Sequence, residues 1–255
     1  MNKFYSIITP PFDPTSGGIR VMYGLYGWLL SKGQIAYTNA TSSNPDEFIA
    51  IYPEIYQGNE ANAGTVVRYL LNKPGTMALY GTPGPTTFDP SDLIYSFSRM
   101  YYDTTEKHTL FLPILNLHIF KDQKRKRSKR AVFVGKGKDE GLHPKECVAV
   151  DRKVAADQQV LADLLNECEV LYSYDPVSAM TEISRLCGCR VVMLQTTYTK
   201  SDYRDYEPGL NGMSFGLEEE VPLDIAGFRS HYIYLRKVFS ERLDQFIEET
   251  QNAAD

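Results

Sequence analysis

The sequence predicts an α/β protein made of two small parallel-sheet domains that face a cleft, with an amphipathic helix at its C-terminal end. Three observations lead to this fold class. Short apolar strands alternate with helical patterns over residues 1–120, the alternation restarts after a basic segment, and apolar residues recur at helical spacing over 225–250. Because parallel strands need crossover connections, we expect each domain to be Rossmann-like, with helices on both faces of its sheet.

The first domain is expected to begin with a strand, a glycine-containing loop and a helix. Residues 4–8 have a strand pattern, and residues 19–32 carry apolar side chains at helical spacing before Gly33. The other elements expected here are strands at 35–38, 48–52, 76–80, 93–97 and 109–115, and a helix at 61–72. Residues 1–120 therefore form the N-terminal domain.

The second domain is expected to begin at KDQKRKRSKR, residues 121–130, where seven of the ten residues are basic. Such a run is either a solvated linker or a local contact with phosphate or RNA. The elements expected after it are strands at 131–134, 147–150, 169–173 and 190–194, and helices at 155–168 and 178–187. Residues 121–224 therefore form the second domain.

The last segment, residues 225–255, is expected to be a helix that packs across the two domains. Its apolar side chains repeat at intervals of three and four, which makes one apolar face. This face closes either the cleft or a homodimer, and the periodicity is compatible with both.

Composition and charge restrict the function. With 255 residues, 43% of them hydrophobic, the chain can bury a full core. The net charge of −5 argues against a surface built for nucleic acid or anionic membrane, because phosphates require a positive field. The opening residues do not have a signal-peptide pattern, and no apolar run is long enough to span a bilayer. We therefore expect a cytoplasmic protein without a transmembrane segment.

The cysteines favour reduced thiols. Cys147, Cys168, Cys187 and Cys189 all lie in the second half, mostly in or beside apolar patterns, which is not typical of a disulfide framework. Cys187 and Cys189 are too close in sequence for a usual zinc pair. No DxD motif follows a strand, so we expect no metal site and no cofactor.

Ligands of open parallel sheets bind at the carboxyl ends of the strands, which directs attention to three loops. In TSGGIRV, Gly17 and Gly18 let the backbone approach a ligand at a helix N-terminus, although a tight turn gives the same pattern. In VGKGKDEG, Lys136 and Lys138 are suited to a diphosphate, and an exposed turn is the alternative.

The third loop is in SYDPVSAMTEISRLCGCRVV, where a strand turns into a helix. Ser178 and Ala179 are expected in the first helical turn, where backbone N–H groups suit a phosphate. Glu182, one turn further on, is placed to accept two ribose hydroxyls. A glutamate favoured by the helix dipole is the equally weighted alternative.

The order of GG-x-x-V, GKGKD and SYDPVSAMTEISRLCGCRVV resembles a glycosyltransferase of the GT-B fold, and the last stretch is similar to the donor-site segment of that fold. Residues 51–75 also resemble a segment of bacterial polysaccharide glycosyltransferases. The resemblance implies a short, nucleotide-sugar-dependent enzyme of polysaccharide biosynthesis. Residues 1–120 would then form its acceptor side and residues 121–224 its donor side.

The same resemblance implies roles for donor-side residues. Glu182 would hold the ribose, Ser178 and Ala179 would give N–H groups to the diphosphate, and Lys136 or Lys138 would neutralise it. Gly17 and Gly18 would face the reacting sugars.

The sequence also departs from the family pattern at two positions. Many retaining members carry a second glutamate eight positions before the ribose-binding one, and in this chain that position is Tyr174. We include Tyr174 among the expected donor-binding residues. Arg190 replaces a frequent proline.

Glycosyl transfer through an oxocarbenium-like state needs stabilisation of the leaving diphosphate, which GT-B enzymes usually provide without a required metal. An inverting enzyme also needs a base for the acceptor hydroxyl. Glu54, after the strand FIAIY, is the preferred candidate and Asp13 the second. The isolated histidines His108, His118 and His143 are assigned structural roles.

The main functional expectation is a transferase that uses a nucleotide-sugar donor and a glycan or other hydroxyl acceptor. Two other classes of function remain open. A catalytically silent module of the same fold would bind a nucleotide or a glycan without turnover. Nucleic-acid binding through residues 121–130 is less favoured, so no nucleic-acid partner is expected.

Overall fold

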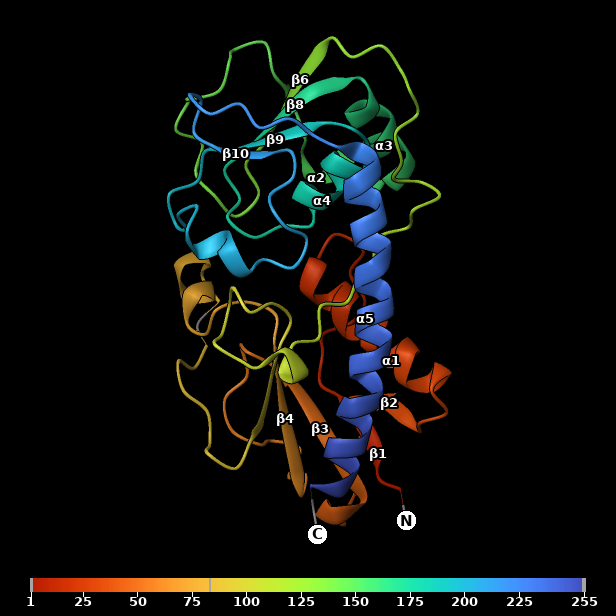
Figure 1. Cartoon of the computed structure of the whole chain (residues 1–255). Coiled ribbons are helices and arrows are strands. Elements are labelled where there is room, and N and C mark those ends of the chain that lie inside the picture. Colours follow the sequence, from red (N-terminus) through yellow and green to blue (C-terminus); the bar gives the residue numbers. More distant parts are fainter. Residues whose placement is uncertain (1, 83, 254–255) are drawn as a thin grey trace. The chain divides into compact units, whose positions relative to one another are not determined.

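The computed structural model describes residues 2–82 and 84–253 and shows two compact α/β units (Figure 1). Unit 1 consists of Met1–Ile114 and Leu235–Asp255, and unit 2 of Leu115–Tyr234. Each unit contains one five-stranded sheet in which every strand pair is parallel. The predicted fold class, two parallel-sheet α/β units with a C-terminal helix, is confirmed.

Unit 1 is built on a sheet with the strand order β2-β1-β3-β4-β5. Its strands are β1 (Phe4–Ile7), β2 (Ala36–Thr38), β3 (Phe48–Pro53), β4 (Thr65–Leu70) and β5 (Leu93–Ser96). Its helices are α1 (Gly17–Ser31), the later part of α5 (Ile225–Asn252) and the short 3₁₀ helices η1 (Pro45–Glu47), η2 (Thr76–Tyr80) and η3 (Glu106–His108).

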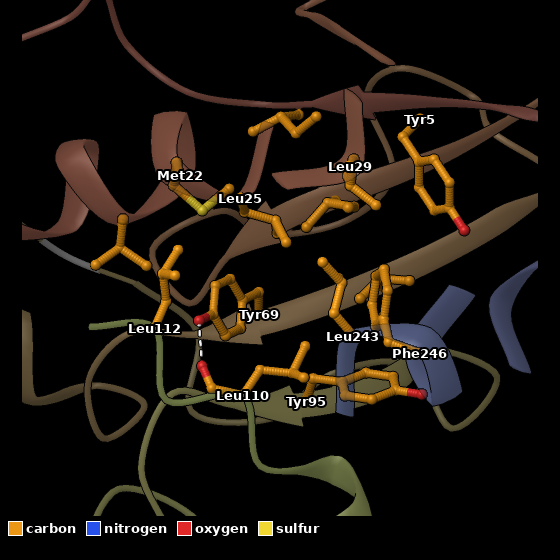
Figure 2. Packing of buried hydrophobic residues seen from close by; sticks show 14 of the residues in the cluster. Tyr5, Met22, Leu25, Leu29, Tyr69, Tyr95, Leu110, Leu112, Leu243 and Phe246 are labelled. Atoms are coloured by element: carbon orange, nitrogen blue, oxygen red, sulfur yellow. Dashed lines mark hydrogen bonds between the residues drawn. The ribbon is translucent and has the colours of Figure 1, made fainter. Parts of the chain in front are cut away.

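One face of this sheet carries the main core of unit 1 (Figure 2). Tyr5 of β1 and Tyr69 of β4 lie on this face with Leu25 of α1 and Phe246 of α5, all buried. The Tyr69 hydroxyl donates a hydrogen bond to the Leu110 carbonyl, which satisfies the one polar atom that this ring brings into the core. Helices α1 and α5 therefore cover the same face of the sheet.

The opposite face of the sheet is covered mainly by irregular chain. Phe48, Ala50 and Tyr52 of β3 pack there with Ala63, from the connection between β3 and β4. Arg68 of β4 anchors this connection: Nη2 donates to the Gly58 carbonyl at 2.6 Å, and Nε pairs with Asp92 at 2.7 Å. The expectation of helices on both faces is wrong for this unit, because the β3–β4 connection contains no helix among its described residues.

Two predicted elements of unit 1 are of a different type in the structure. The helix predicted at 61–72 is strand β4, because its Thr-Val-Val run is β-branched and a buried parallel strand has no alternating pattern. The strand predicted at 76–80 is the 3₁₀ helix η2, bounded by Gly75 and Gly81, both with left-handed backbone angles.

The segment predicted as a strand at 109–115 has only one isolated bridge, between Ser96 and Thr109. Its side chains Leu110 and Leu112 nevertheless fill the core of unit 1 (Figure 2). The prediction of a strand here is therefore wrong, although apolar side chains of this segment are buried.

Unit 2 is built on a sheet with the strand order β7-β6-β8-β9-β10. Its strands are β6 (Lys129–Phe133), β7 (Val148–Ala149), β8 (Cys168–Ser173), β9 (Arg190–Met193) and β10 (Met213–Phe215). Its helices are α2 (Arg152–Ala156), α3 (Gln158–Asn166), α4 (Met180–Leu186) and the 3₁₀ helix η4 (Asp202–Asp205), with the first residues of α5. Helix α3 packs against β8 and α4 against β9.

The helix predicted at 155–168 is two helices, because the backbone of Asp157 is extended between α2 and α3. The Asp157 side chain accepts hydrogen bonds from the N–H groups of Gln159 and Val160 and so caps α3. The helix predicted at 225–250 is confirmed as α5. Across the described residues, no helix is both long and apolar enough to span a membrane.

Candidate functional site

The two sheets have the same strand order, with the first strand of each unit flanked by its second and third strands. The chain therefore changes direction between β1 and β3 in unit 1 and between β6 and β8 in unit 2. In open parallel sheets, ligands bind outside the carboxyl ends of the two strands at such a switch point. The switch point of unit 2 is formed by Val134–Gly137 after β6 and Tyr174–Val177 after β8.

Two glycines allow these two loops to pack closely. A Cβ atom on Gly137 would lie 1.9 Å from the Tyr174 carbonyl oxygen, and one on Gly135 would lie 2.1 Å from Oδ2 of Asp175. Gly135 also has φ of +56°, which side-chain-bearing residues rarely adopt. Glycine is thus required at both positions by the neighbouring chain.

Asp175 ties the two loops together and is only 2% exposed. Its Oδ2 accepts the backbone N–H of Lys136 at 2.9 Å, and its Oδ1 accepts the N–H of Val177 at 2.9 Å. This carboxylate also lies 3.5 Å from the Lys136 ammonium group. Asp175 was not among the residues selected from the sequence, because its burial and its contacts with the other loop become visible only in the structure.

Of the two predicted lysines, the structure brings Lys136 to the switch point. Its ammonium group donates to the Val177 carbonyl at 2.8 Å, and its side chain is 35% exposed. Lys138 is in the same loop, but its side chain is 84% exposed and pairs with Glu140 at 3.0 Å. Lys136 therefore offers a fixed positive charge at this edge, and Lys138 a solvated one.

Ser178 and Ala179 lie just before α4 and not in its first turn, since the helix begins at Met180. The Ser178 hydroxyl accepts the N–H of Met180 at 3.2 Å. Among the described residues, nothing accepts a hydrogen bond from the backbone N–H of Ser178 or of Ala179. Two backbone donors are thus available close to Val177, whose carbonyl binds Lys136.

Tyr174 is buried, and its hydroxyl organises the loop that follows β6. This oxygen accepts the N–H of Leu142 at 2.8 Å and lies 3.1 Å from Nδ1 of His143. His143 also lies 3.5 Å from Asp139. His143 was assigned a structural role, and here it helps to hold the lysine-bearing loop, although no partner for it could be named from the sequence.

Glu182 lies in the first turn of α4 and is 6% exposed. Its Oε1 accepts a hydrogen bond from the Tyr206 hydroxyl, and its Oε2 accepts one from the Thr181 hydroxyl at 2.9 Å. Burial, and next the neighbouring Glu182 carboxylate, raises the pKa of Tyr206 well above its usual value, so the phenol stays a donor. In this structure both carboxylate oxygens bind side chains of the protein itself.

Arg185, fully buried on the same helix, balances this cluster. Its Nη1 donates to the carbonyl of Gly209 at 2.7 Å, and its guanidinium carbon lies 4.1 Å from the ring centroid of Phe228. Burial lowers the pKa of this guanidinium, while Tyr206 and Glu182 oppose that effect. Within the described residues, Nη2 of Arg185 has no hydrogen-bond partner.

The predicted residues of unit 1 lie around its own switch point. Glu54 directly follows β3, is 6% exposed, and accepts the N–H of Leu71 at 2.9 Å. Asp13, in the β1–α1 loop, accepts the N–H and the hydroxyl of Thr15 at 2.8 and 2.7 Å. Both carboxylates therefore organise backbone near the ends of β1 and β3.

Gly17 and Gly18 are the first two residues of α1, two residues earlier than predicted, and Ser16 caps the helix through its side chain. A Cβ on Gly17 would meet no atom within 4 Å, and one on Gly18 would lie 3.4 Å from Leu71. The protein itself therefore does not require glycine at position 17, and the open space is free for a ligand.

The basic segment 121–130 is largely neutralised within unit 2. Arg125 pairs with Asp163 at 2.7 Å, and Lys129 with Glu167. Arg127 pairs with Asp122 at 2.7 Å and also donates to carbonyl groups at the ends of α3 and α4. This geometry favours the structural interpretation of the run over a nucleic-acid contact.

The four cysteines are free, as expected, and three of them are buried. Burial raises the pKa of Cys168 to about 11 and that of Cys187 to about 12, so both thiols stay protonated at neutral pH. In the described part of the chain, no three His, Cys, Asp or Glu side chains are grouped as metal ligands.

No protein-family model and no curated protein matches the chain. Among solved structures, an uncharacterized protein from Klebsiella pneumoniae matches with a TM-score of 0.50 and 13% identity, over 85% of this chain and 93% of that chain. This likeness shows a shared fold.

Two further structures are glycosyltransferases by name. An alpha-glucosyltransferase in complex with UDP and DNA has a TM-score of 0.44 and 10% identity, over 100% of this chain and 96% of that chain. Spinosyn forosaminyltransferase SpnP has a TM-score of 0.38 and 11% identity, over 99% and 97%. At these scores, the two names describe those proteins and carry no argument about this one.

Proposed function

We propose that the chain is a glycosyltransferase that moves a sugar from a nucleotide-sugar donor to a hydroxyl group of a glycan or similar acceptor. One observation carries the proposal: at the switch point of unit 2, a glycine-lined loop carries the Lys136 ammonium, which binds the Val177 carbonyl, and the backbone N–H groups of the next two residues, Ser178 and Ala179, are unoccupied. A cation and amide donors together suit a diphosphate. Glu182, a few residues further along the chain, would accept the ribose hydroxyls.

In the proposed reaction, the bond between the anomeric carbon and the diphosphate oxygen breaks and the acceptor oxygen bonds to that carbon. The departing nucleoside diphosphate takes the bonding electron pair. Lys136 and the two amides would stabilise this developing negative charge, so that the donor site needs no metal ion for this purpose. Lys138, solvated in the same loop, would contribute through its long-range charge.

The acceptor hydroxyl loses a proton as it attacks, and unit 1 would supply the base. Glu54 remains the preferred candidate because it follows β3 directly at the switch point of unit 1. Asp13, in the loop after β1, is the second candidate. Gly17, with open space beside it, would let the reacting sugar approach the start of α1.

The experiment is a donor screen with the purified chain. Release of the nucleotide from UDP-, GDP-, dTDP- and CMP-activated sugars is measured with and without EDTA, using water or added glycans as acceptors. We expect one nucleotide class to be turned over in the presence of EDTA, and kcat/KM to fall at least about tenfold in Glu182→Gln. The absence of turnover of every donor would contradict the transferase proposal.

A second candidate function has its own supporting observation. Glu54 and Asp13 both already accept backbone N–H groups, and a carboxylate engaged in this way is less available as a base. A catalytically silent module that binds a nucleotide or a glycan would fit this geometry. Tight nucleotide binding without release of the nucleotide from any activated sugar would identify it.

A further inference from the structure

The segment between β9 and β10 contacts the candidate site through two tyrosine hydroxyl groups. The Tyr206 hydroxyl donates to Oε1 of Glu182, and the Tyr203 hydroxyl donates to the carbonyl of Pro176. Both tyrosines are at least nine-tenths buried. The segment therefore contacts the β8–α4 connection at Pro176, next to Val177, whose carbonyl binds Lys136. It also contacts helix α4 at Glu182.

Within the segment, an aromatic cluster holds the two hydroxyls in place. The Tyr203 ring packs against Tyr206 and Tyr198 of the segment and against Phe215 of β10, with centroid distances of 5.6, 6.2 and 5.1 Å. The pairs with Tyr206 and Tyr198 are edge-to-face and the pair with Phe215 is tilted, and such contacts fix ring orientation without a large helix or strand. The regular structure in the segment is the four-residue 3₁₀ helix η4.

The two ends of the segment are defined by local contacts. At one end, the Gln195 side chain bonds to the N–H and the carbonyl of Tyr198 at 2.8 and 2.7 Å. At the other end, Gly209 has φ of +68° with open space beside it, and its carbonyl accepts from Arg185. A short segment bounded by a flexible residue can open without disturbing the sheet.

We propose that residues 195–209 form a lid that closes the donor site in the absence of ligand. In the closed state, the Tyr206 hydroxyl is hydrogen-bonded to the Glu182 carboxylate, which would otherwise bind the two ribose hydroxyls. This inference rests on the proposed function. Donor binding replaces the Tyr206 hydrogen bond on Glu182 with hydrogen bonds from the vicinal diol. The ligand class that opens the lid is therefore a ribonucleotide with both hydroxyls free.

The closed lid lowers the apparent affinity, because only the open fraction of molecules binds ligand. Tyr206→Phe keeps the ring and its packing but leaves Oε1 of Glu182 buried without its donor, which disfavours the closed state. The variant should bind UDP about three- to tenfold more tightly than the wild type. Its affinity for 2′-deoxy-UDP should rise by the same factor, because the open fraction is common to both ligands, but that ligand should bind more weakly than UDP to both proteins, since it offers Glu182 one hydroxyl only.

The experiment combines calorimetric titration of UDP and 2′-deoxy-UDP with hydrogen–deuterium exchange of the ligand-free full chain. The control is Tyr172→Phe, a tyrosine 8% exposed in the same unit that is grouped with Val132 and Val170 in a different part of the core. In Tyr206→Phe, but not in Tyr172→Phe, amides within residues 199–209 should exchange at least about threefold faster.

The two readouts separate this inference from the proposed function. If UDP binds the wild type and Tyr206→Phe equally and lid exchange is unchanged, the lid is wrong while the donor site stands. If lid exchange accelerates but neither protein binds UDP or 2′-deoxy-UDP, the lid does not gate a site for these ligands and this inference is contradicted, while the donor screen decides the proposed function.

Discussion

Gly137 and Gly17 both belong to glycine-containing segments that the sequence predicted to face a ligand, but their surroundings in the structure differ. At Gly137, an added Cβ would lie 1.9 Å from the Tyr174 carbonyl oxygen. At Gly17, nothing lies within 4 Å of the same atom. The packing of the two loops therefore requires glycine at position 137. At position 17, only a ligand that comes close to the backbone would require it.

This difference predicts opposite outcomes for one substitution. Gly137→Ala should lower the free energy of unfolding by about 1–3 kcal/mol, because the backbone must move away from Tyr174. Gly17→Ala should change it by less than about 0.5 kcal/mol. Urea denaturation of both variants measures this, and equal losses of stability would show that the two loops do not pack as described.

At the residue scale, individual site residues could be predicted from the sequence, but the residues that they contact could not. Lys136 and Glu182 were selected because each follows a strand end, and both are found near that edge. Their partners Asp175 and Tyr206 were missed, because a buried carboxylate and a distant tyrosine show no spacing pattern. Only the folded chain brings such residues together.

At the scale of elements, Arg127 shows how a basic run becomes structural. Its Nη1 donates to the carbonyls of Leu165 and Asn166 at the end of α3, at 3.2 and 3.1 Å, and its Nη2 donates to that of Cys187 after α4 at 2.7 Å. These carbonyl groups would otherwise lack partners, as at every helix C-terminus. One side chain thus caps two helices.

Arg127→Ala should therefore lower the free energy of unfolding by about 3 kcal/mol, from lost hydrogen bonds and an unpaired Asp122. Lys126→Ala is the matched control, because Lys126 is exposed, and its removal should cost less than about 0.5 kcal/mol. Thermal unfolding measures both. A small effect of Arg127→Ala together with strongly salt-dependent RNA binding would favour the nucleic-acid interpretation.

Elements with a clear period were predicted well, and short apolar runs were not. Helices α1 and α5 have apolar faces long enough to fix the period. Strand β4 and helix η2 are each six residues or fewer, so tertiary packing decides their type. Strand β10, with three residues, was not predicted at all.

At the scale of the whole chain, the last turns of α5 join the C-terminal segment to the start of unit 1. Gln251 exchanges two hydrogen bonds with the backbone of Lys3, each 2.9 Å. Glu249 accepts from Tyr95 at 2.9 Å and pairs with Lys107 at 2.8 Å. The sequence predicted this helix and its apolar face, and its polar contacts with distant residues could not be predicted from period alone.

Glu249 gives these contacts a pH dependence. Burial alone would raise the pKa of its carboxyl group, but Lys107, Tyr95 and His108 outweigh it, so the pKa lies below its usual value of 4.5. A group with a lowered folded-state pKa stabilises the protein above the unfolded-state pKa and loses this contribution as the pH falls through the folded value.

We therefore expect the wild type to lose stability below about pH 4.5 more steeply than Glu249→Gln, which should already be less stable at pH 7. The measurement is the melting temperature from pH 7 to pH 3. Parallel curves for the two proteins would show that Glu249 does not contribute through its charge.

The two-unit organisation was predicted from the restart of the strand and helix alternation, and the shared strand order then places one switch point in each unit. The claim that depends most on this organisation is that the switch point of unit 2 binds the diphosphate of a nucleotide. Lys136 and Lys138 allow a matched test, since they differ in position but not in charge.

The most direct measurement is calorimetric titration of UDP, GDP, dTDP and CMP into the wild type, Lys136→Met and Lys138→Met. We predict that one nucleotide binds the wild type, that Lys136→Met weakens it at least about tenfold, and that Lys138→Met weakens it less than about threefold. Equal effects of the two substitutions, or no binding of any nucleotide to the wild type, would contradict a donor site between β6 and β8.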